Sequence, residues 1–140
     1  MQEKKKKEKI AISAVGSDLN SLVDSRFGRC SYFLLIDKEG ELIESIPNQG
    51  QQARRGAGVA AAQTLVDAGV ETVISGNIGP SAYSVLNPSG VKIFQVGYGV
   101  TADKAFEEYK KGNLEEMNSS SSHPGSIPPR GGSRRRFGGR

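Results

Sequence analysis

Residues 32–46 read YFLLIDKEGELIESI, and this stretch sets the fold class. Its two apolar runs, 32–37 and 41–46, are joined by Lys-Glu-Gly, a short glycine-containing turn that is typical of a β-hairpin. The second run alternates only weakly, as an edge strand with one solvated face does. A further apolar run, IAISAV at 10–15, precedes the hairpin and is expected to be a buried strand.

Helix-like and strand-like runs alternate after the hairpin. The helix-like runs cover 58–68, 80–86 and 101–111, and the short apolar runs between them cover 72–75 and 91–96. Gly69 stands where a helix C′ glycine belongs, Pro80 stands at a first helical position, and Thr101 can cap the last helix. A hairpin followed by strand–helix units predicts a mixed α/β sheet with right-handed crossovers.

This topology brings four connections to one edge of the sheet. If the first strand runs up, the second runs down, and the strands entered through helices are parallel to the first. The connections at the carboxyl edge are then 16–31, 47–57, 76–80 and 97–101. Open α/β sheets bind ligands outside the carboxyl ends of their strands, so we expect a binding site at this edge.

The arginines of the globular body are concentrated in two of these connections. Residues 10–117 carry nine Lys or Arg and thirteen Asp or Glu, a net charge of −4, so the body is acidic. Its only arginines, together with the only cysteine of the chain, are Arg26, Arg29, Cys30, Arg54 and Arg55. Guanidinium groups suit oxyanions and phosphates, so this clustering predicts an anion site; chance and ordinary surface solvation are the alternative explanation.

Glycine-rich segments lead into the helices at the same edge. They are Arg55-Gly56-Ala57-Gly58, Gly76-Asn77-Ile78-Gly79-Pro80 and Gly97-Tyr98-Gly99-Val100-Thr101. Free backbone N–H groups at helix N-termini favour anions, so the three segments together predict an anion cradle, although each alone is also ordinary turn chemistry. The sequence contains neither GxxxxGK[ST] nor a GxGxxG fingerprint after the first strand.

Conventional catalysis has little support in the sequence, and we expect no enzyme. The only histidine is His123, in the C-terminal tail, and there is no CxxC or HExxH motif. Asp18 and Asp24 could bind a hard metal, but a local turn at Asp18 and an ion pair between Asp24 and Arg26 or Arg29 are the better interpretations. Cys30 is either a buried, inert residue or, if exposed beside the arginines, a thiolate and a soft metal ligand.

The ends of the chain differ in composition from the body. Residues 1–9 are Lys-rich and residues 118–140 are rich in Ser, Gly and Arg, so we expect two disordered basic tails around a domain at 10–117. Because the tails are basic, they suggest an alternative function, which is weak binding to nucleic acid or to an acidic partner protein. The lone cysteine and the lack of long apolar stretches indicate a cytoplasmic protein that does not bind membranes.

Three motifs resemble those of the dinitrogenase iron–molybdenum cofactor biosynthesis family, of the NifX/NafY type and the carboxyl-terminal domain of NifB. They are DSRFGRCSYF at 24–33, GAG at 56–58 and SGNIGPSAY at 75–83. The small stand-alone archaeal and bacterial members look most similar, over about residues 9–112. The resemblance implies an RNase H-like three-layer fold with helices on both faces of a five-stranded mixed sheet of order 3-2-1-4-5. It also implies binding or carriage of an iron–sulfur or iron–molybdenum cluster or precursor, without turnover.

One position departs from the family pattern. Nitrogenase-linked members often have His before Phe-Gly, implicated in cofactor binding, whereas this chain has Arg26. Cys30 is then the candidate metal ligand, or the cargo is another anion such as a thiomolybdate, exchanged with a donor or acceptor protein. One cysteine cannot hold a four-thiolate cluster alone. The predicted cofactor-binding residues are Arg26, Phe27, Gly28, Arg29, Cys30, Arg54, Arg55, Gly56, Gly76, Asn77 and Gly79.

Overall fold

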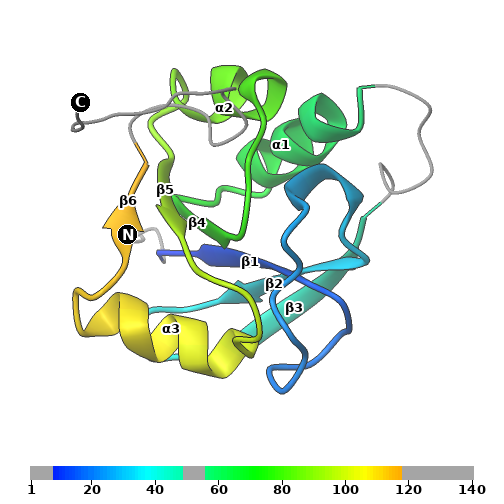
Figure 1. Ribbon diagram of the computed structural model, residues 1–140. Helices are drawn as coiled ribbons and strands as arrows, with labels where there is room; N and C mark the ends of the chain where they lie inside the picture. Colours follow the sequence, from blue (N-terminus) through cyan, green and yellow to red (C-terminus); the bar gives the residue numbers. More distant parts are fainter. Residues whose placement is uncertain (1–7, 49–55, 118–140) are drawn as a thin grey trace, which may run out of the picture.

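One mixed sheet organises the residues that the computed structural model describes, 8–48 and 56–117 (Figure 1). Its strands are β1 (Ile10–Ala14), β2 (Tyr32–Ile36), β3 (Leu42–Pro47), β4 (Thr72–Ser75), β5 (Lys92–Gln95) and β6 (Glu115–Glu116). β1 is antiparallel to β2 and parallel to β4, and β4 is parallel to β5. The hairpin and the strand directions predicted from the sequence are confirmed, and so is the order 3-2-1-4-5 that the family resemblance implied.

Helices cover both faces of the sheet, as Figure 1 shows. The helices are α1 (Ala57–Asp67), α2 (Pro80–Leu86) and α3 (Ala102–Lys110), with a short 3-10 turn η1 (Phe27–Arg29) before β2. α1 and α2 lie on one face and α3 lies on the other. Pro80 is the first residue of α2, and Gly69 follows α1 with a φ of 82°, as predicted.

The alternation of side chains along the strands divides the apolar core into two layers. Ala11, Phe33 and Val73 face α1 and α2, where they pack with Leu65 and Leu86. Their strand neighbours, Ile12, Leu34 and Ile74 among them, face α3 on the other side of the sheet. Central strands buried on both faces have continuous apolar sequences, which is why 10–15 and 72–75 could be recognised as strands.

The prediction of a five-stranded sheet is wrong by one strand. β6 pairs with β5 in antiparallel register, with Phe94 opposite Glu116, and the Met117 N–H donates to the Ile93 carbonyl at 2.7 Å. β6 consists of two exposed glutamates, so no apolar pattern marks it. The RNase H-like label stays a prediction. Of the two predicted tails, residues 1–7 and 118–140 lie outside the described residues. Lys9, which was placed in the N-terminal tail, is described, and its carbonyl accepts the Glu71 N–H at 3.0 Å.

The strand register places the predicted connections at one edge. Ala14, Tyr32 and Pro47 stand side by side across β1, β2 and β3, and Ser75 stands beside Gln95. The segments 15–31, 76–79 and 96–101 therefore meet at the carboxyl edge of the parallel strands, on the right of Figure 1. Within the described ranges, no helix is long and apolar enough to cross a membrane.

Candidate functional site

Backbone hydrogen bonds join the segment before η1 to the segment after β4. Arg26 and Asn77 form an isolated parallel β-bridge. The Phe27 N–H donates to the Asn77 carbonyl at 3.2 Å, and the Asn77 N–H donates to the Ser25 carbonyl at 2.9 Å. A Cβ at Gly76 would lie 2.5 Å from the Ser25 Cα, so this close approach of the two chains requires glycine.

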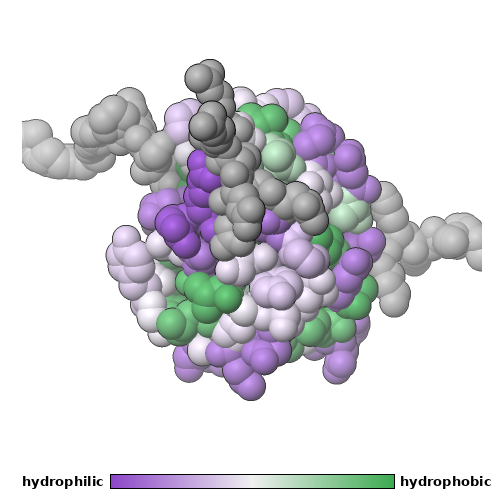
Figure 2. All heavy atoms as spheres, turned by 90° about the vertical axis from the view of Figure 1, so that its right-hand side faces the viewer, coloured by the Kyte–Doolittle hydropathy of each residue, from purple (hydrophilic) through white to green (hydrophobic). Residues whose placement is uncertain are grey.

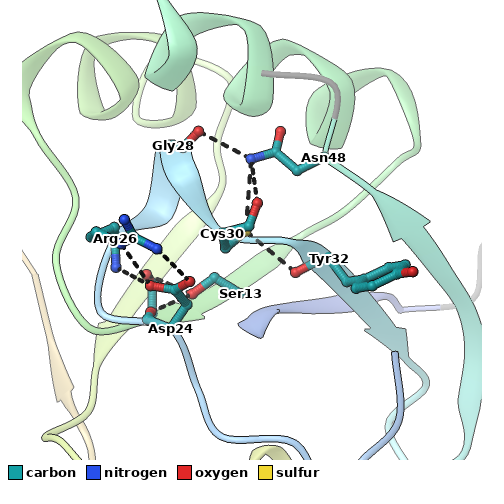
Figure 3. A network of polar contacts seen from close by, with 8 residues as sticks. Ser13, Asp24, Arg26, Gly28, Cys30, Tyr32 and Asn48 are labelled. Atoms are coloured by element: carbon teal, nitrogen blue, oxygen red, sulfur yellow. Dashed lines mark hydrogen bonds and ion pairs between the residues drawn. The ribbon is translucent and has the colours of Figure 1, made fainter. Parts of the chain in front are cut away.

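Asp24 holds Arg26 in place (Figure 3). Its Oδ1 accepts the Arg26 backbone N–H at 2.9 Å and the side-chain Nε–H at 3.2 Å, while Oδ2 accepts from Nη2 at 3.4 Å. The Asp24 side chain is 6% exposed and that of Arg26 is 65% exposed. The hydrogen bond and the charge of Asp24 raise the pKa of the Arg26 guanidinium, which therefore stays cationic at any physiological pH. The predicted ion pair is confirmed, and it presents a fixed cation at the surface.

Two buried serines anchor this arrangement to the central strands. The Ser13 hydroxyl, at the end of β1, donates to the Asp24 carbonyl at 3.0 Å and lies 2.8 Å from the Ser75 hydroxyl, at the end of β4. The Asp24 N–H in turn donates to the Ser13 carbonyl at 2.9 Å. Both serines are at most 1% exposed. The Asp24–Arg26 pair thus rests on the rigid centre of the sheet.

η1 packs directly against the N-terminus of α1. A Cβ at Gly28 would lie 2.8 Å from the Gly58 nitrogen, so the two backbones touch where only glycine fits. Gly56 is the N-cap residue of α1 with a φ of 74°, and among the described residues no side chain caps the helix. The first intrahelical bond runs from the Ala60 N–H to the Gly56 carbonyl, at 2.9 Å. This first turn of α1, whose Gly58 nitrogen lies against η1, is the positive end of the helix dipole.

Cys30 lies beneath this surface and not on it. It is 0% exposed, and its thiol donates to the Tyr32 carbonyl at 3.3 Å (Figure 3). Burial, followed by the negative charge of Asp24, raises the pKa of the Cys30 thiol to about 12. The nearby Arg26 lowers it too little to compensate. The thiol is therefore protonated at neutral pH.

Asn48, directly after β3, binds the backbone of the segment that leads from η1 into β2. Its side-chain amide donates to the Gly28 carbonyl at 3.0 Å and to the Cys30 carbonyl at 2.9 Å, and it lies 3.9 Å from the Cys30 sulfur (Figure 3). Its backbone N–H donates to the Ser31 carbonyl at 3.0 Å. These contacts fix the segment from Gly28 to Ser31 against the end of β3.

The expectation that Cys30 is an accessible thiolate disagrees with this geometry. Flanking arginines lower a thiol pKa only where the sulfur is exposed to their field, whereas here desolvation dominates. The inert, buried interpretation agrees with the structure. Among the described residues, no three His, Cys, Asp or Glu side chains lie close enough to hold a metal ion.

The other predicted site residues divide into four groups. Arg26, Gly28, Gly56, Gly76 and Asn77 come together at the edge, which Figure 2 faces and which combines hydrophilic and apolar side chains. Phe27 is 2% exposed and packs against Phe33 in a tilted arrangement, with the ring centroids 5.1 Å apart, so it belongs to the core. Arg29 and Gly79 are half-buried near the edge. Arg54 and Arg55 lie outside the described residues.

Four residues that support the site were not among those predicted: Ser13, Asp24, Asn48 and Ser75. Asp24 and Asn48 could have been predicted, because each is a short polar residue within one of the two connections that contain the arginines. The sequence predicted the ion pair of Asp24 but not its role in supporting the site. The serines lie inside apolar strand sequences, and their pairing follows from the contact of β1 with β4.

A larger cavity of about 490 Å³ lies at the opposite edge of the sheet. It is lined by the turns after α1 and α2 and by Glu8, Glu71 and Lys92. Helix C-termini and an excess of carboxylates repel anions, so its electrostatics are the reverse of those at the arginine edge. Size alone does not make it the anion site.

The comparison with known proteins matches this architecture to one family. The model of the family described as dinitrogenase iron-molybdenum cofactor matches residues 8–112. The chain belongs to the dinitrogenase iron-molybdenum cofactor family. The predicted family relationship is thereby confirmed, and the matched range covers the whole described site.

Relatives of this dinitrogenase cofactor-family chain are similar along nearly their full length. An uncharacterized protein of Methanocaldococcus jannaschii is 31% identical over 101 residues, which is 70% of this chain and 85% of that protein. The apo form of the orange protein from Desulfovibrio gigas has a TM-score of 0.77 and 31% identity, covering 83% of this chain and 98% of the other. A NifB-like protein from Thermotoga has a TM-score of 0.72 and 36% identity, covering 84% and 99%.

Proposed function

We propose that this protein binds and carries an anionic metal–sulfur cargo at the carboxyl edge of its sheet, without chemically converting it. The cargo is an iron–sulfur or iron–molybdenum cluster, a precursor of one, or a related oxyanion or thioanion. Membership of the cofactor family supports this class of cargo, and the site supports an anion. Exchange of the cargo with a donor or acceptor protein in the cytoplasm belongs to the same proposal.

The fixed, exposed guanidinium of Arg26 is the observation that carries the proposal. Asp24 orients it through two hydrogen bonds while leaving it 65% exposed. The N-terminus of α1, which no described side chain caps, packs against η1, and both groups favour negative charge. A guanidinium and backbone N–H groups recognise an anion through hydrogen bonds and do not require direct metal ligation.

Two predicted residues extend this site along the chain. Arg55 is covalently bonded to Gly56, the N-cap of α1, and Arg54 precedes it. We propose that both contribute positive charge at this edge. Cys30 is assigned to the packing beneath the site, because it is buried and protonated.

The test is an anaerobic absorbance titration of the protein with tetrathiomolybdate. Arg26→Ala is expected to weaken binding by roughly tenfold, because it removes a charge-assisted hydrogen bond. Arg54→Ala is expected to weaken binding in the same direction. Lys92→Ala is the matched control, since it removes the same charge from the opposite edge and should leave binding unchanged. Equal losses in Arg26→Ala and Lys92→Ala would contradict the proposal.

A further inference from the structure

A small cleft of about 120 Å³ opens beside Arg26, between the ends of β4 and β5. Ser25 and Asn77 line one side of it, and Gln95, Gly97 and Tyr98 line the other. A water molecule needs about 10–15 Å³ of such space, so the cleft has room for several waters or for a small polyatomic group.

The cleft is polar but carries no formal charge. None of its lining residues is Asp, Glu, Lys or Arg. Its polar side chains are the hydroxyls of Ser25 and Tyr98 and the amides of Asn77 and Gln95, each able to donate or accept a hydrogen bond. Within the described part of the chain, none of these four side chains makes a hydrogen bond to another residue. Their hydrogen-bonding capacity is available to a ligand.

The position of this cleft relative to Arg26 is fixed. The Asn77 N–H donates to the Ser25 carbonyl and the Phe27 N–H donates to the Asn77 carbonyl, on either side of Arg26. The β-bridge pairs Arg26 itself with Asn77. The backbone of Arg26 is therefore held against one wall of the cleft, so neutral donors and acceptors lie next to the residue that carries the cation.

We propose that this cleft is a neutral subsite of the anion site, an inference that rests on the proposed function. Arg26 holds the charged end of the cargo, and Ser25, Asn77 and Gln95 hold a second polar group of the same molecule. The cargo that uses both parts is a polynuclear metal–sulfur anion, longer than a single tetrahedral anion.

Gly97 gives a direct way to close the cleft. It lines the cleft, its φ is not in the left-handed region, and a Cβ built on it meets nothing within 4 Å. A side chain at this position therefore enters open space without straining the backbone. Gly97→Leu is the blocking variant, and Gly97→Ala is its graded control with one methyl group.

The experiment compares two dianions in anaerobic titrations of the full chain. One is tetrathiomolybdate, and the other is the dinuclear anion formed from tetrathiomolybdate and ferrous chloride. Gly97→Leu is expected to weaken binding of the dinuclear anion by at least about tenfold, and binding of tetrathiomolybdate by less than about twofold. The affinity of Gly97→Ala for the dinuclear anion is expected to lie between those of wild type and Gly97→Leu. If Gly97→Leu does not fold, the double variant Asn77→Ala/Gln95→Ala is expected to show the same selectivity.

The outcomes separate the two proposals. Wild type that binds both anions, with variants that bind both as wild type does, overturns the subsite and leaves the carrier function standing. Equal weakening of both anions also overturns it, because the cleft would then not distinguish length. Wild type that binds neither anion overturns the proposed function, and the subsite with it.

Discussion

At the scale of single residues, Asp24 orients the flexible side chain of Arg26 while leaving its guanidinium exposed. The carboxylate is buried and accepts both the backbone and the side-chain N–H of Arg26. The ion pair restricts the rotamers of Arg26 before a ligand arrives, so less conformational entropy is lost on binding. The ion pair therefore contributes to ligand binding through this preorganisation, because an exposed ion pair contributes little to the stability of the fold.

Gly28 is predicted to be essential for the contact between η1 and α1. A Cβ at this position would lie 2.8 Å from the Gly58 nitrogen and 2.9 Å from the Gly58 Cα, both backbone atoms that cannot rotate away. Gly28→Ala is therefore expected to lower the free energy of unfolding by about 1–3 kcal/mol, measured by urea denaturation. Gly97→Ala is the matched control, expected to change stability by less than about 0.5 kcal/mol. Equal stability of the two variants would contradict this packing.

The burial of Cys30 predicts how stability depends on pH. The ordinary thiol pKa of 9.0 is raised to about 12 in the folded protein. Folding therefore favours the protonated thiol, and this contribution is complete below pH 9.0 and lost as the pH rises toward 12. From about pH 8 to about pH 10.5, wild type is expected to lose about 2 kcal/mol more stability than Cys30→Ala. Parallel pH profiles of the two proteins would show that the thiol is exposed.

At the scale of elements, Asn48 joins the end of β3 to η1 and the start of β2. Its side-chain amide donates hydrogen bonds to the carbonyls of Gly28 and Cys30, so removal of the amide leaves these acceptors without that donor. Asn48→Ala is expected to cost about 1–3 kcal/mol of stability. It should also speed the reaction of Cys30 with a thiol reagent under native conditions. Asn87→Ala, at the exposed C-terminus of α2, is the control and should change neither quantity.

The sequence predicted most elements because their patterns are local. The turn at 38–40, Pro80 and Gly69 each mark a boundary through their own backbone preference. β6 was missed because two exposed glutamates pair only once β5 is in place. The state of Cys30 was also beyond the sequence alone, because residues far away in the chain, Asn48 among them, decide whether the thiol is covered.

The whole molecule has two edges of opposite electrostatic character. The start of α1 and the exposed Arg26 lie at the carboxyl edge. The ends of α1 and α2 lie beside Glu8 and Glu71 at the other edge, around the larger cavity. The sequence predicted the first edge from the position of its arginines, because parallel strands entered through helices end on one side.

The basic tails provide a competing explanation for any anion binding, and their removal separates the two. The described residues contain both core layers and the whole described site. A chain limited to residues 8–117 is therefore expected to keep its affinity for tetrathiomolybdate within about threefold in an absorbance titration. It should lose any salt-sensitive binding to nucleic acid. Loss of tetrathiomolybdate binding in the shortened chain would assign that binding to the tails.

The central claim is that the anion site lies at the arginine edge, and an NMR titration of the labelled protein with tetrathiomolybdate tests it most directly. The amide signals of Gly28, Gly58 and Asn77 are predicted to shift, because they lie beside Arg26 and the start of α1. Those of Gly69 and Gly90, which line the larger cavity, are predicted to stay unchanged. Shifts confined to Gly69 and Gly90 would place the ligand at the opposite edge and contradict the account.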